Sequence, residues 1–564
     1  MIPSSRRQFV IRLASLATVA SSGMALSACM GDGGEPPVFS YGVCSGDPLA
    51  DRVMLWTHAQ VPNSSEDVPL TYEVATDASF ATLVSSGSTL ASAASGHTAK
   101  ADATGLAAGK DYFFRFRSGD TVSPVGRTRT LPAAGVTSVS LAVFSCSNYP
   151  AGYFNVYAEA AKSGAQFAVH LGDFIYEYGA DGYASTDAKA LGRVVEPANE
   201  CLSLADYRKR YAQYRSDPDS KVFSASLPLI AVWDDHEVAN DTHKDGAENH
   251  TATTEGSFAA RRAAAIQAWH EWMPVRAPDA SNLMKIYRSF DFGGLAALHM
   301  LDTRVIGRDK QVEFAELLNP ATAATAQATL ASTSRTIMGS TQLQWLQGQL
   351  AASKATWQVL GQQVLMARME FPVSILTHLN PDNTSPDALA AGQKAITDYL
   401  TAKGTAAQAP ALLTDAQKAL LDTKLNPKLG YNLDAWDGYP VEREIVLSTA
   451  AKLGKKLVVL AGDTHNAWCS RLTLVNGTVV GQEFGTSSVS SPGFEEYLTA
   501  LPPAQTKQIF EGVVNDLRYA DTSRRGFLVM NFTPIEAKGT FCFVSTVKSR
   551  TYTVDATTTL SVSA

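Results

Sequence analysis

Cysteine, charge and long apolar runs are all scarce in this chain of 564 residues. Its six cysteines are too few for the disulfide framework that a small secreted domain would use in place of a large core. The net charge of −7 leaves no basic excess to neutralise phosphates, which excludes a general nucleic-acid binder. The remaining composition, with 45% hydrophobic and 18% charged residues, is that of a globular protein, and the length predicts more than one domain.

The first residues carry the features of an export signal. Ser5-Arg6-Arg7-Gln8-Phe9-Val10 resembles a twin-arginine signal, and the stretch behind it is too short and too polar for a membrane span. Leu26-Ser27-Ala28-Cys29 resembles a lipoprotein processing site at which Cys29 is lipidated; the alternative is an ordinary cleavable signal with an incidental cysteine. We therefore expect residues 1–28 to be a signal peptide read by the twin-arginine export machinery. The mature protein is then periplasmic or extracellular, with a membrane tether if Cys29 is lipidated.

Residues 38–132 show only the signals of β structure. Arg52–Thr57, Leu70–Ala75 and Asp111–Arg117 are rich in β-branched and aromatic residues, and turn residues separate them at the spacing of a small antiparallel sandwich. Gly105–Tyr112 resembles the corner of a fibronectin-III domain. We predict an N-terminal antiparallel β-sandwich of fibronectin-III or immunoglobulin type, with a structural role or as a wall of the active site.

Residues 138–550 alternate between strand and helix patterns, which predicts an α/β domain. Strands are expected at Val139–Ser145, Gln166–Leu171, Leu229–Trp233, Leu295–Leu301, Trp357–Met366 and Leu457–Ala461, and helices at Phe258–Trp272 and Thr341–Ala352. The closing strands, near residues 526–532 and 539–547, indicate a mixed sheet. The stretches Ala321–Ser334 and Asn380–Leu425 are interpreted as surface insertions.

Three of the predicted strands end in clusters of acidic and histidine residues. Gly172-Asp173 with Tyr176, Asp234-Asp235-His236-Glu237, and Gly462-Asp463-Thr464-His465 each follow an apolar run. Ligands bind at the carboxyl ends of strands in open α/β sheets, and a carboxylate and a phenol three residues apart can reach one cation. One such aspartate is typical of a solvated turn, but three similar strand ends favour a metal site.

These motifs resemble those of PhoD-type alkaline phosphatases, which belong to the calcineurin-like metallophosphoesterases. The Gly-Asp-x-x-Tyr element is shared with purple acid phosphatases. Further motifs carry the resemblance along most of the mature chain: Gly46-Asp47-Pro48 before Leu55-Trp56, Phe144–Tyr149, Trp233–Glu237, Leu301–Arg304, Gln342 with Trp345-Leu346, and Asp434–Tyr439. The resemblance implies an N-terminal β-sandwich followed by an α/β metallophosphoesterase domain with a central mixed-sheet sandwich.

The resemblance also implies a site that holds Fe(III) and Ca(II). Cys146, Asp173, Tyr176 and His465 match the family's iron environment, Asp235 and Asp463 match the adjacent calcium, and Asp173 is the expected bridge. His236 and Arg304 match positions that contact the phosphate or the leaving group. Each has an alternative: Cys146 as a small buried hydrophobe, His236 as a support, and Arg304 as a structural ion pair. Glu237, Asp234, Asn240 and His243 are expected to support ligands, and His170 to pack beneath the site.

The implied activity is hydrolysis of phosphate mono- or diesters by in-line attack of metal-bound hydroxide, with a small phosphoester or a phospholipid as substrate. We expect a monomer. A phospholipase D-like activity and a non-catalytic lipoprotein stapled by metal are the alternatives. Two features depart from the family: Gln362-Gln363 replace an expected asparagine and receive no metal role, and Pro502–Asn515 is a weak match to the C-terminal helix that covers the site in long members.

Overall fold

The computed structural model of the protein describes residues 35–378, 385–499 and 501–563. The predicted signal peptide and Cys29 lie outside the described residues, so their roles stay predictions. Among the described residues, none of the helices combines the length and the apolarity that crossing a membrane requires.

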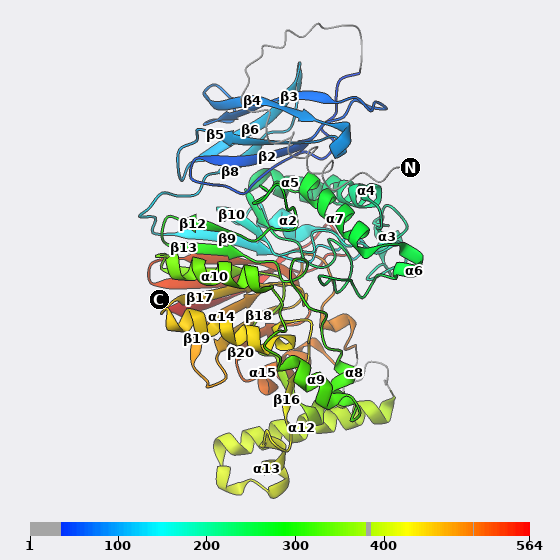
Figure 1. Ribbon diagram of the computed structural model, residues 1–564, viewed down its shortest axis with the longest axis vertical. Helices are drawn as coiled ribbons and strands as arrows, with labels where there is room; N and C mark the ends of the chain where they lie inside the picture. The colour runs from blue at the N-terminus through cyan, green and yellow to red at the C-terminus, as the bar shows by residue number, and fades with distance from the viewer. Residues whose placement is uncertain (1–34, 379–384, 500, 564) are drawn as a thin grey trace.

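Two large sheets form the centre of the molecule (Figure 1). Each sheet has three neighbouring parallel strands at its centre, with antiparallel strands beside them. In the first sheet these are β9 (Val139–Phe144), β10 (Phe167–His170) and β11 (Leu229–Ala231), and in the second β13 (Ala296–Met300), β14 (Trp357–Gly361) and β17 (Lys456–Ala461). The nine-stranded sheet has the order β23 (Val554–Ser563), β22 (Glu536–Val544), β21 (Arg525–Phe532), β9 (Val139–Phe144), β10 (Phe167–His170), β11 (Leu229–Ala231), β1 (Val43–Gly46), β2 (Arg52–His58) and β5 (Thr98–Thr104). The seven-stranded sheet has the order β12 (Arg288–Phe292), β13 (Ala296–Met300), β14 (Trp357–Gly361), β17 (Lys456–Ala461), β19 (Val479–Gly485), β18 (Ala467–Thr473) and β20 (Leu517–Asp521).

The two sheets pack face to face through one apolar core. The rings of Phe167 and Phe292, one from each sheet, lie 5.1 Å apart, and the Trp357 indole donates to the Thr533 carbonyl at 2.7 Å. Because both faces of the parallel strands are covered, their residues are buried throughout, which explains the unbroken apolar runs in the sequence. The predicted central mixed-sheet sandwich is confirmed.

Helices cover the outer faces of these sheets. Helix α7 (Phe258–Trp272) ends two residues before Pro274, as predicted, and α10 (Ser340–Ala352) coincides with the predicted second helix to within one residue. Helices α2 (Asn155–Ala160), α4 (Leu204–Ser216) and α5 (Pro218–Ser226) also contribute to the core around the first sheet, and α14 (Pro440–Lys452) to that around the second.

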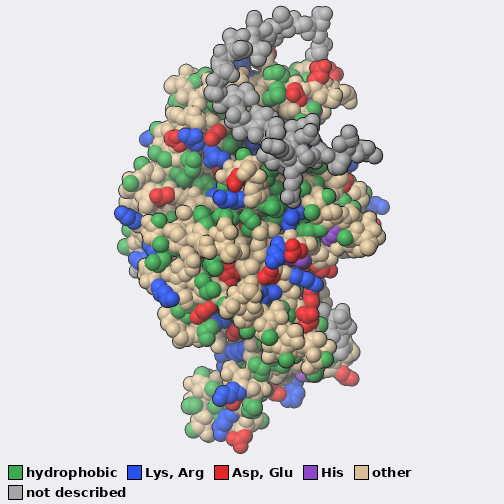
Figure 2. Space-filling model, viewed as in Figure 1, with side chains coloured by type: hydrophobic (Ala, Val, Ile, Leu, Met, Phe, Trp, Pro, Cys, Tyr) green, Lys and Arg blue, Asp and Glu red, His purple; other side chains and the backbone are tan. Residues whose placement is uncertain are grey.

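The two predicted insertions fold as peripheral helices. The first contains α9 (Ala323–Leu330), and α8 (Phe314–Leu318) lies just before it. The second contains α12 (Pro386–Gln408) and α13 (Asp415–Leu421), which project from the lower end of the molecule in Figures 1 and 2. Helix α15 (Pro503–Val513) forms where a covering helix was proposed, but its Phe510 packs on the rings of Phe371, Tyr431 and Trp468.

The N-terminal strands form the predicted β-sandwich. One layer of the sandwich is the β1, β2 and β5 end of the nine-stranded sheet. The other layer is a separate sheet of β4 (Leu83–Ala91), β3 (Val68–Ala75), β6 (Asp111–Ser118) and β7 (Thr121–Val122), with β8 (Gly126–Arg129) also paired to β6. Tyr112 accepts a hydrogen bond from the Ala107 amide at 2.8 Å, which is the contact expected of a fibronectin-III corner. Apolar residues of both layers, including Leu55, Val74 and Phe114, fill the space between them.

The sandwich is continuous with the central sheet, which the sequence does not indicate. Strand β1 pairs in parallel with β11 at Gly46 and Leu229, and the Asp47 amide donates to the Leu229 carbonyl at 3.0 Å. A Cβ at Gly46 would lie 2.4 Å from the Pro274 carbonyl oxygen, so the approach requires glycine. Asp47 accepts two hydrogen bonds from Arg288, at 2.6 and 3.0 Å. The Gly-Asp-Pro motif therefore joins the two parts.

Candidate metal centre

The predicted metal residues all lie just beyond the carboxyl ends of central strands. Cys146 follows β9, Asp173 and Tyr176 follow β10, and Asp235 and His236 follow β11, while Asp463 and His465 follow β17 of the second sheet. Since the two sheets are stacked, these ends meet at one edge of the core. Three overlapping groups of side chains there have ligand atoms within 4.8 Å of one another: Cys146, Asp173 and His465; Asp173, Asp235 and His236; and Asp234, Asp235 and Asp463.

Four of these residues adopt a left-handed backbone that is costly for any residue but glycine. Cys146, Asp173, Asp463 and His465 have φ values of +61°, +56°, +66° and +62°. Such conformations cluster at functional sites, where the surrounding fold holds them in place. At Gly172, before Asp173, an added Cβ would lie 2.4 Å from Cβ of Asp234, so glycine lets two strand ends come together.

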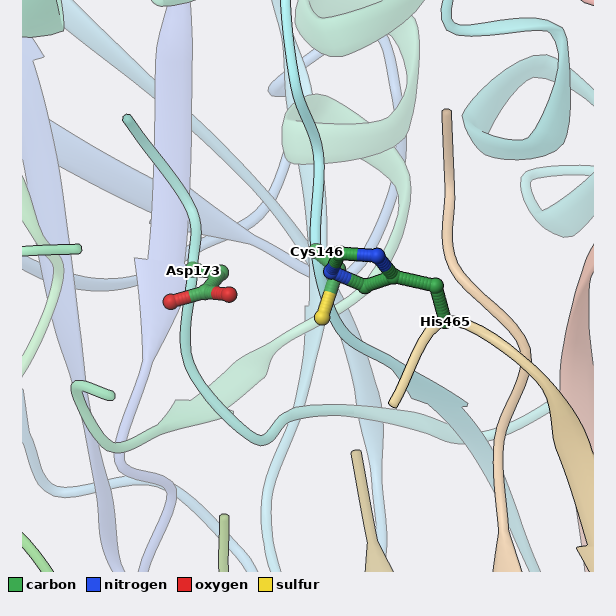
Figure 3. A group of neighbouring side chains, drawn as sticks. All are labelled: Cys146, Asp173 and His465. Atoms are coloured by element: carbon green, nitrogen blue, oxygen red, sulfur yellow. The ribbon is translucent and has the colours of Figure 1, made fainter. Parts of the chain in front are cut away.

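Cys146, Asp173, Tyr176 and His465 form what we call the mixed-donor cluster. Figure 3 shows Cys146, Asp173 and His465, each leaving a different loop. The Tyr176 hydroxyl lies 3.1 Å from both Asp173 Oδ2 and His465 Nε2. Cys146 is fully buried, and like the other four described cysteines it is free of disulfide bonds. The cluster thus offers a thiol, a carboxylate, a phenol and an imidazole to one point.

Hydrogen bonds from two loops orient the mixed-donor cluster. His465 Nδ1 lies 2.9 Å from the Pro492 carbonyl oxygen, so Nδ1 carries the proton and Nε2 presents its lone pair to the cluster. Ser491 donates to the Tyr176 hydroxyl at 2.7 Å. Burial raises the pKa of the Cys146 thiol and of the Tyr176 phenol well above their ordinary values, and lowers the pKa of His465 to about 3. A bound cation would reverse the preference of the thiol and the phenol for their neutral forms.

Asp234, Asp235 and Asp463 form what we call the acidic cluster, and Arg304 lies among them. Its buried guanidinium contacts Asp463 at 2.9 Å, Asp235 at 3.7 Å and Asp434 at 2.7 Å, and also pairs with Asp234. The position of Arg304 among carboxylates favours its interpretation as a structural ion pair. Its contact with phosphate stays a prediction. Burial raises the pKa of Asp463 to about 7, whereas at Asp235 burial is outweighed by Arg304 and His236, and the pKa falls to about 2.

The two clusters are joined by Asp173, Asp235 and His236. Asp173 Oδ1 and Asp235 Oδ1 are both buried, and neither has a hydrogen-bond partner among the described residues. His236 Nδ1 lies 2.7 Å from Glu177 Oε2, which leaves Nε2 free to face a ligand. The Arg304 guanidinium lies 3.7 Å from Asp235 Oδ1, which is beyond hydrogen-bond distance. A buried carboxylate oxygen without a hydrogen bond is costly unless a cation binds it, so Asp173 Oδ1 makes this junction suited to a bridging role for Asp173.

Several residues support the site, and only some of them were expected from the sequence. Glu237, expected only as a general support, accepts the backbone N–H groups of Asp173, Phe174 and Asp234 at 2.9, 2.6 and 2.7 Å. Glu177 directly follows the Gly-Asp-x-x-Tyr element and could have been identified by its position. Asp434 begins the Asp434–Tyr439 motif but received no role from it, whereas Ser491 and Tyr183, whose hydroxyl lies 3.2 Å from His465 Nδ1, come from loops without a catalytic pattern.

Two polar residues without a predicted metal role make hydrogen bonds within the fold. Gln363 accepts from the Thr303 amide at 3.1 Å and donates to the carbonyls of Trp233 and Leu301, so it ties three strand ends together. His170 is buried, and its Nε2 lies 2.9 Å from the Tyr157 hydroxyl.

A cavity of about 210 Å³ lies apart from the site, between α14 and strands β15 (Glu370–Pro372) and β16 (Lys428–Gly430).

Comparison with known proteins places this arrangement in a family. The PhoD-like phosphatase family model matches residues 141–541, and the model of the family's N-terminal domain matches residues 25–132. Alkaline phosphatase D of Bacillus subtilis is 34% identical over 470 residues, which cover 81% of this chain and 70% of that protein. The solved structure of PhoD superposes with a TM-score of 0.74 at 30% identity, covering 95% of this chain and 92% of that one. The chain therefore belongs to the PhoD-like phosphatase family.

Proposed function

We propose that this PhoD-like phosphatase hydrolyses phosphate mono- or diesters outside the cytoplasm, with Fe(III) in the mixed-donor cluster and Ca(II) in the acidic cluster. The observation that carries the proposal is the pair of buried oxygens, Asp173 Oδ1 and Asp235 Oδ1, which lack hydrogen-bond partners at the junction of the two clusters. Such atoms are stabilised by cations, and a cation bound there would lie beside both candidate sites.

The donor atoms of each cluster fit the proposed ions. A thiol, a phenol, an imidazole and a carboxylate suit a strongly acidic trivalent ion, which stabilises their anionic forms. The acidic cluster offers carboxylate oxygens, the ligands that Ca²⁺ takes in flexible geometry. When bound, the metal pair would neutralise charge on the phosphoryl group and lower the pKa of a water molecule.

The chain's own residues supply orientation and proton transfer. Glu177 holds Nδ1 of His236, and the carboxylates of Asp235 and Glu177 outweigh burial and raise the pKa of His236 well above its ordinary value. A protonated His236 could donate from Nε2 to the oxygen of the leaving alcohol. Arg304 holds Asp234, Asp434 and Asp463 in place, which fixes the shape of the acidic cluster.

A panel of substrates tests this proposal. Purified protein supplied with iron and calcium should release p-nitrophenol from p-nitrophenyl phosphate, from bis-p-nitrophenyl phosphate, or from both. Phosphatidylcholine in the same panel separates the phospholipase D-like alternative. Binding of both metals without turnover of any of the three would favour the non-catalytic lipoprotein.

The proposed location rests on the sequence of the first 29 residues. Export should fail when Arg6 and Arg7 are both replaced by lysine, and the membrane-bound fraction should become soluble when Cys29 is replaced by alanine. Cell fractionation measures both outcomes. Export of the double-lysine variant at the wild-type level would contradict the twin-arginine route.

A further inference from the structure

The candidate metal centre is open to solvent on one side. Cys146, Asp173, Tyr176 and Asp235 are buried, whereas Asp463 and His465 are partly exposed. A substrate must therefore approach the clusters from the side on which Asp463 and His465 lie.

Three tyrosines that take no part in the proposed metal binding lie on this side. Tyr178 and Tyr183 are partly exposed, and Tyr497 is 59% exposed. The Tyr178 ring lies 5.3 Å from that of His236 and 6.0 Å from that of Tyr183. The Tyr183 ring lies 6.1 Å from that of His465, at an angle of 29° between the ring planes. The two rings, tilted by 52° to each other, thus line an aromatic surface between the two histidines of the site.

Hydrogen bonds hold this aromatic surface in position. Tyr497 donates to the Tyr183 hydroxyl at 2.8 Å, and that hydroxyl lies 3.2 Å from His465 Nδ1. Tyr183 belongs to the loop after β10, whereas Tyr497 follows the short 3₁₀ helix Phe494–Glu496 far along the chain. The Tyr183 ring is therefore fixed at both the candidate ligand and the outer loop, which reduces the entropy lost when a ligand stacks on it.

We propose that Tyr178 and Tyr183 bind the leaving group of the ester, and that they select leaving groups that carry a planar aromatic ring. This inference rests on the proposed phosphoester hydrolysis and adds the substrate class to it. An aromatic face attracts another aromatic ring in offset or edge-to-face packing, worth roughly 0.5–1.5 kcal/mol beyond the area that is buried. With the phosphate held at the clusters, a ring on the leaving alcohol would reach the tyrosines beside His236, the proposed proton donor.

A matched pair of esters isolates the aromatic contribution. 2-Phenylethyl phosphate and 2-cyclohexylethyl phosphate have leaving alcohols of similar size and acidity, but only the first has a π face. A merely apolar surface favours the cyclohexyl compound, which is the more hydrophobic of the two, whereas stacking favours the phenyl compound. We expect kcat/KM of the wild type to favour the phenyl ester roughly 2- to 10-fold.

Variants assign this preference to the two rings. Tyr178→Leu and Tyr183→Leu should each reduce it, and the double variant should remove or invert it. Tyr183→Phe keeps the ring and should keep the preference, even if the lost contact with His465 lowers kcat. Tyr72→Leu, the same change at a partly exposed tyrosine on β3 of the sandwich, is the control and should leave the ratio unaltered. Melting temperatures establish that each variant is folded.

Binding of the two corresponding phosphonates, measured by calorimetry, separates this inference from the proposed function. Tighter binding of the phenyl phosphonate without turnover of either ester would support the aromatic surface and overturn the hydrolase. Turnover of both esters with no preference, or a preference that survives in the double variant, would overturn the aromatic surface and leave the hydrolase standing. A preference for the cyclohexyl compounds would also overturn it.

Discussion

The mixed-donor cluster and the acidic cluster share one edge of the core, yet they balance charge in different ways. In the mixed-donor cluster, neutral partners hold the side chains: the Ser491 hydroxyl on Tyr176 and the Pro492 carbonyl on His465. In the acidic cluster, the guanidinium of Arg304 lies directly among the carboxylates. The protein itself thus supplies a cation to one half of the site and uncharged hydrogen bonds to the other.

This difference predicts how firmly each of the two clusters should hold an ion. An ion in the mixed-donor cluster converts neutral thiol and phenol groups to anions, and a buried anion left behind would be costly, so its release should be slow. An ion in the acidic cluster leaves behind carboxylates that Arg304 already neutralises in part, and Asp463 is partly exposed. We therefore expect the acidic cluster to exchange its ion more readily.

The largest effect of any substitution should come from Asp173→Asn, which removes a charge that serves both clusters. Iron and calcium content, measured by elemental analysis, should both fall, and activity should fall further than the roughly 10- to 100-fold typical of a residue that only supports a ligand. Asp47→Asn is the control, since Asp47 is equally buried but pairs with Arg288. Retention of both metals by Asp173→Asn would show that Asp173 does not bridge.

Removing calcium should affect the acidic cluster and leave the mixed-donor cluster intact. Treatment with EGTA should abolish activity, and added Ca²⁺ should restore it, whereas Zn²⁺ should do so poorly because the acidic cluster offers only hard oxygen donors. Iron content and visible absorption should survive the treatment. Full activity after exhaustive chelation would contradict the calcium assignment and favour a centre closer to that of the purple phosphatases.

Tyr176→Phe tests the mixed-donor half alone. Tyrosinate bound to Fe(III) absorbs visible light, so the wild type should be coloured, and the variant should lose the band together with much of its iron and activity. The ring stays in place, so the melting temperature should change little; losing the hydroxyl's hydrogen bonds costs about 1 kcal/mol each. A colourless wild type with stoichiometric iron, or a variant with unaltered colour and turnover, would contradict the assignment of Tyr176 as an iron ligand.

The smallest effect on activity should come from Arg304→Gln, which removes the guanidinium that lies among the carboxylates of the acidic cluster. If Arg304 only organises the carboxylates, activity should fall by about 10- to 100-fold. Without calcium the melting temperature should drop, because the carboxylates repel one another, and added calcium should raise it by more than in the wild type. Arg308→Gln is the control, because of these carboxylates Arg308 pairs only with Asp434. An equal calcium response in wild type and Arg304→Gln would contradict the idea that Arg304 and calcium neutralise the same carboxylates.

The strands and the residues at their ends could be predicted from the sequence because both depend on local patterns. Buried parallel strands require unbroken apolar runs, and the chain must then turn sharply, which placed Asp173, Asp235 and Asp463 correctly at one edge. The roles of these residues in metal binding stay predictions. Helix α7 was predicted to its last residue because Pro274 follows it.

Contacts between distant loops could not be predicted in this way. Tyr183 and Tyr497 are 314 residues apart, and Arg304 meets Asp434 across 130 residues. Such pairs leave no local periodicity, since they depend on how the two sheets stack. Arg304 shows the limit most clearly: a motif predicted its place at a strand end, but its partners come from three other segments of the chain.

The hydrogen-bonded junction between β1 and β11 also limits how the chain can be shortened. A truncated protein that begins after Arg129 would lack β1, and β11 would become an unprotected edge strand three residues before Asp234. Exposed apolar edges pair with other chains, so such a fragment should aggregate rather than fold as an isolated hydrolase. The N-terminal sandwich thus serves as the cap that keeps the central sheet from polymerising.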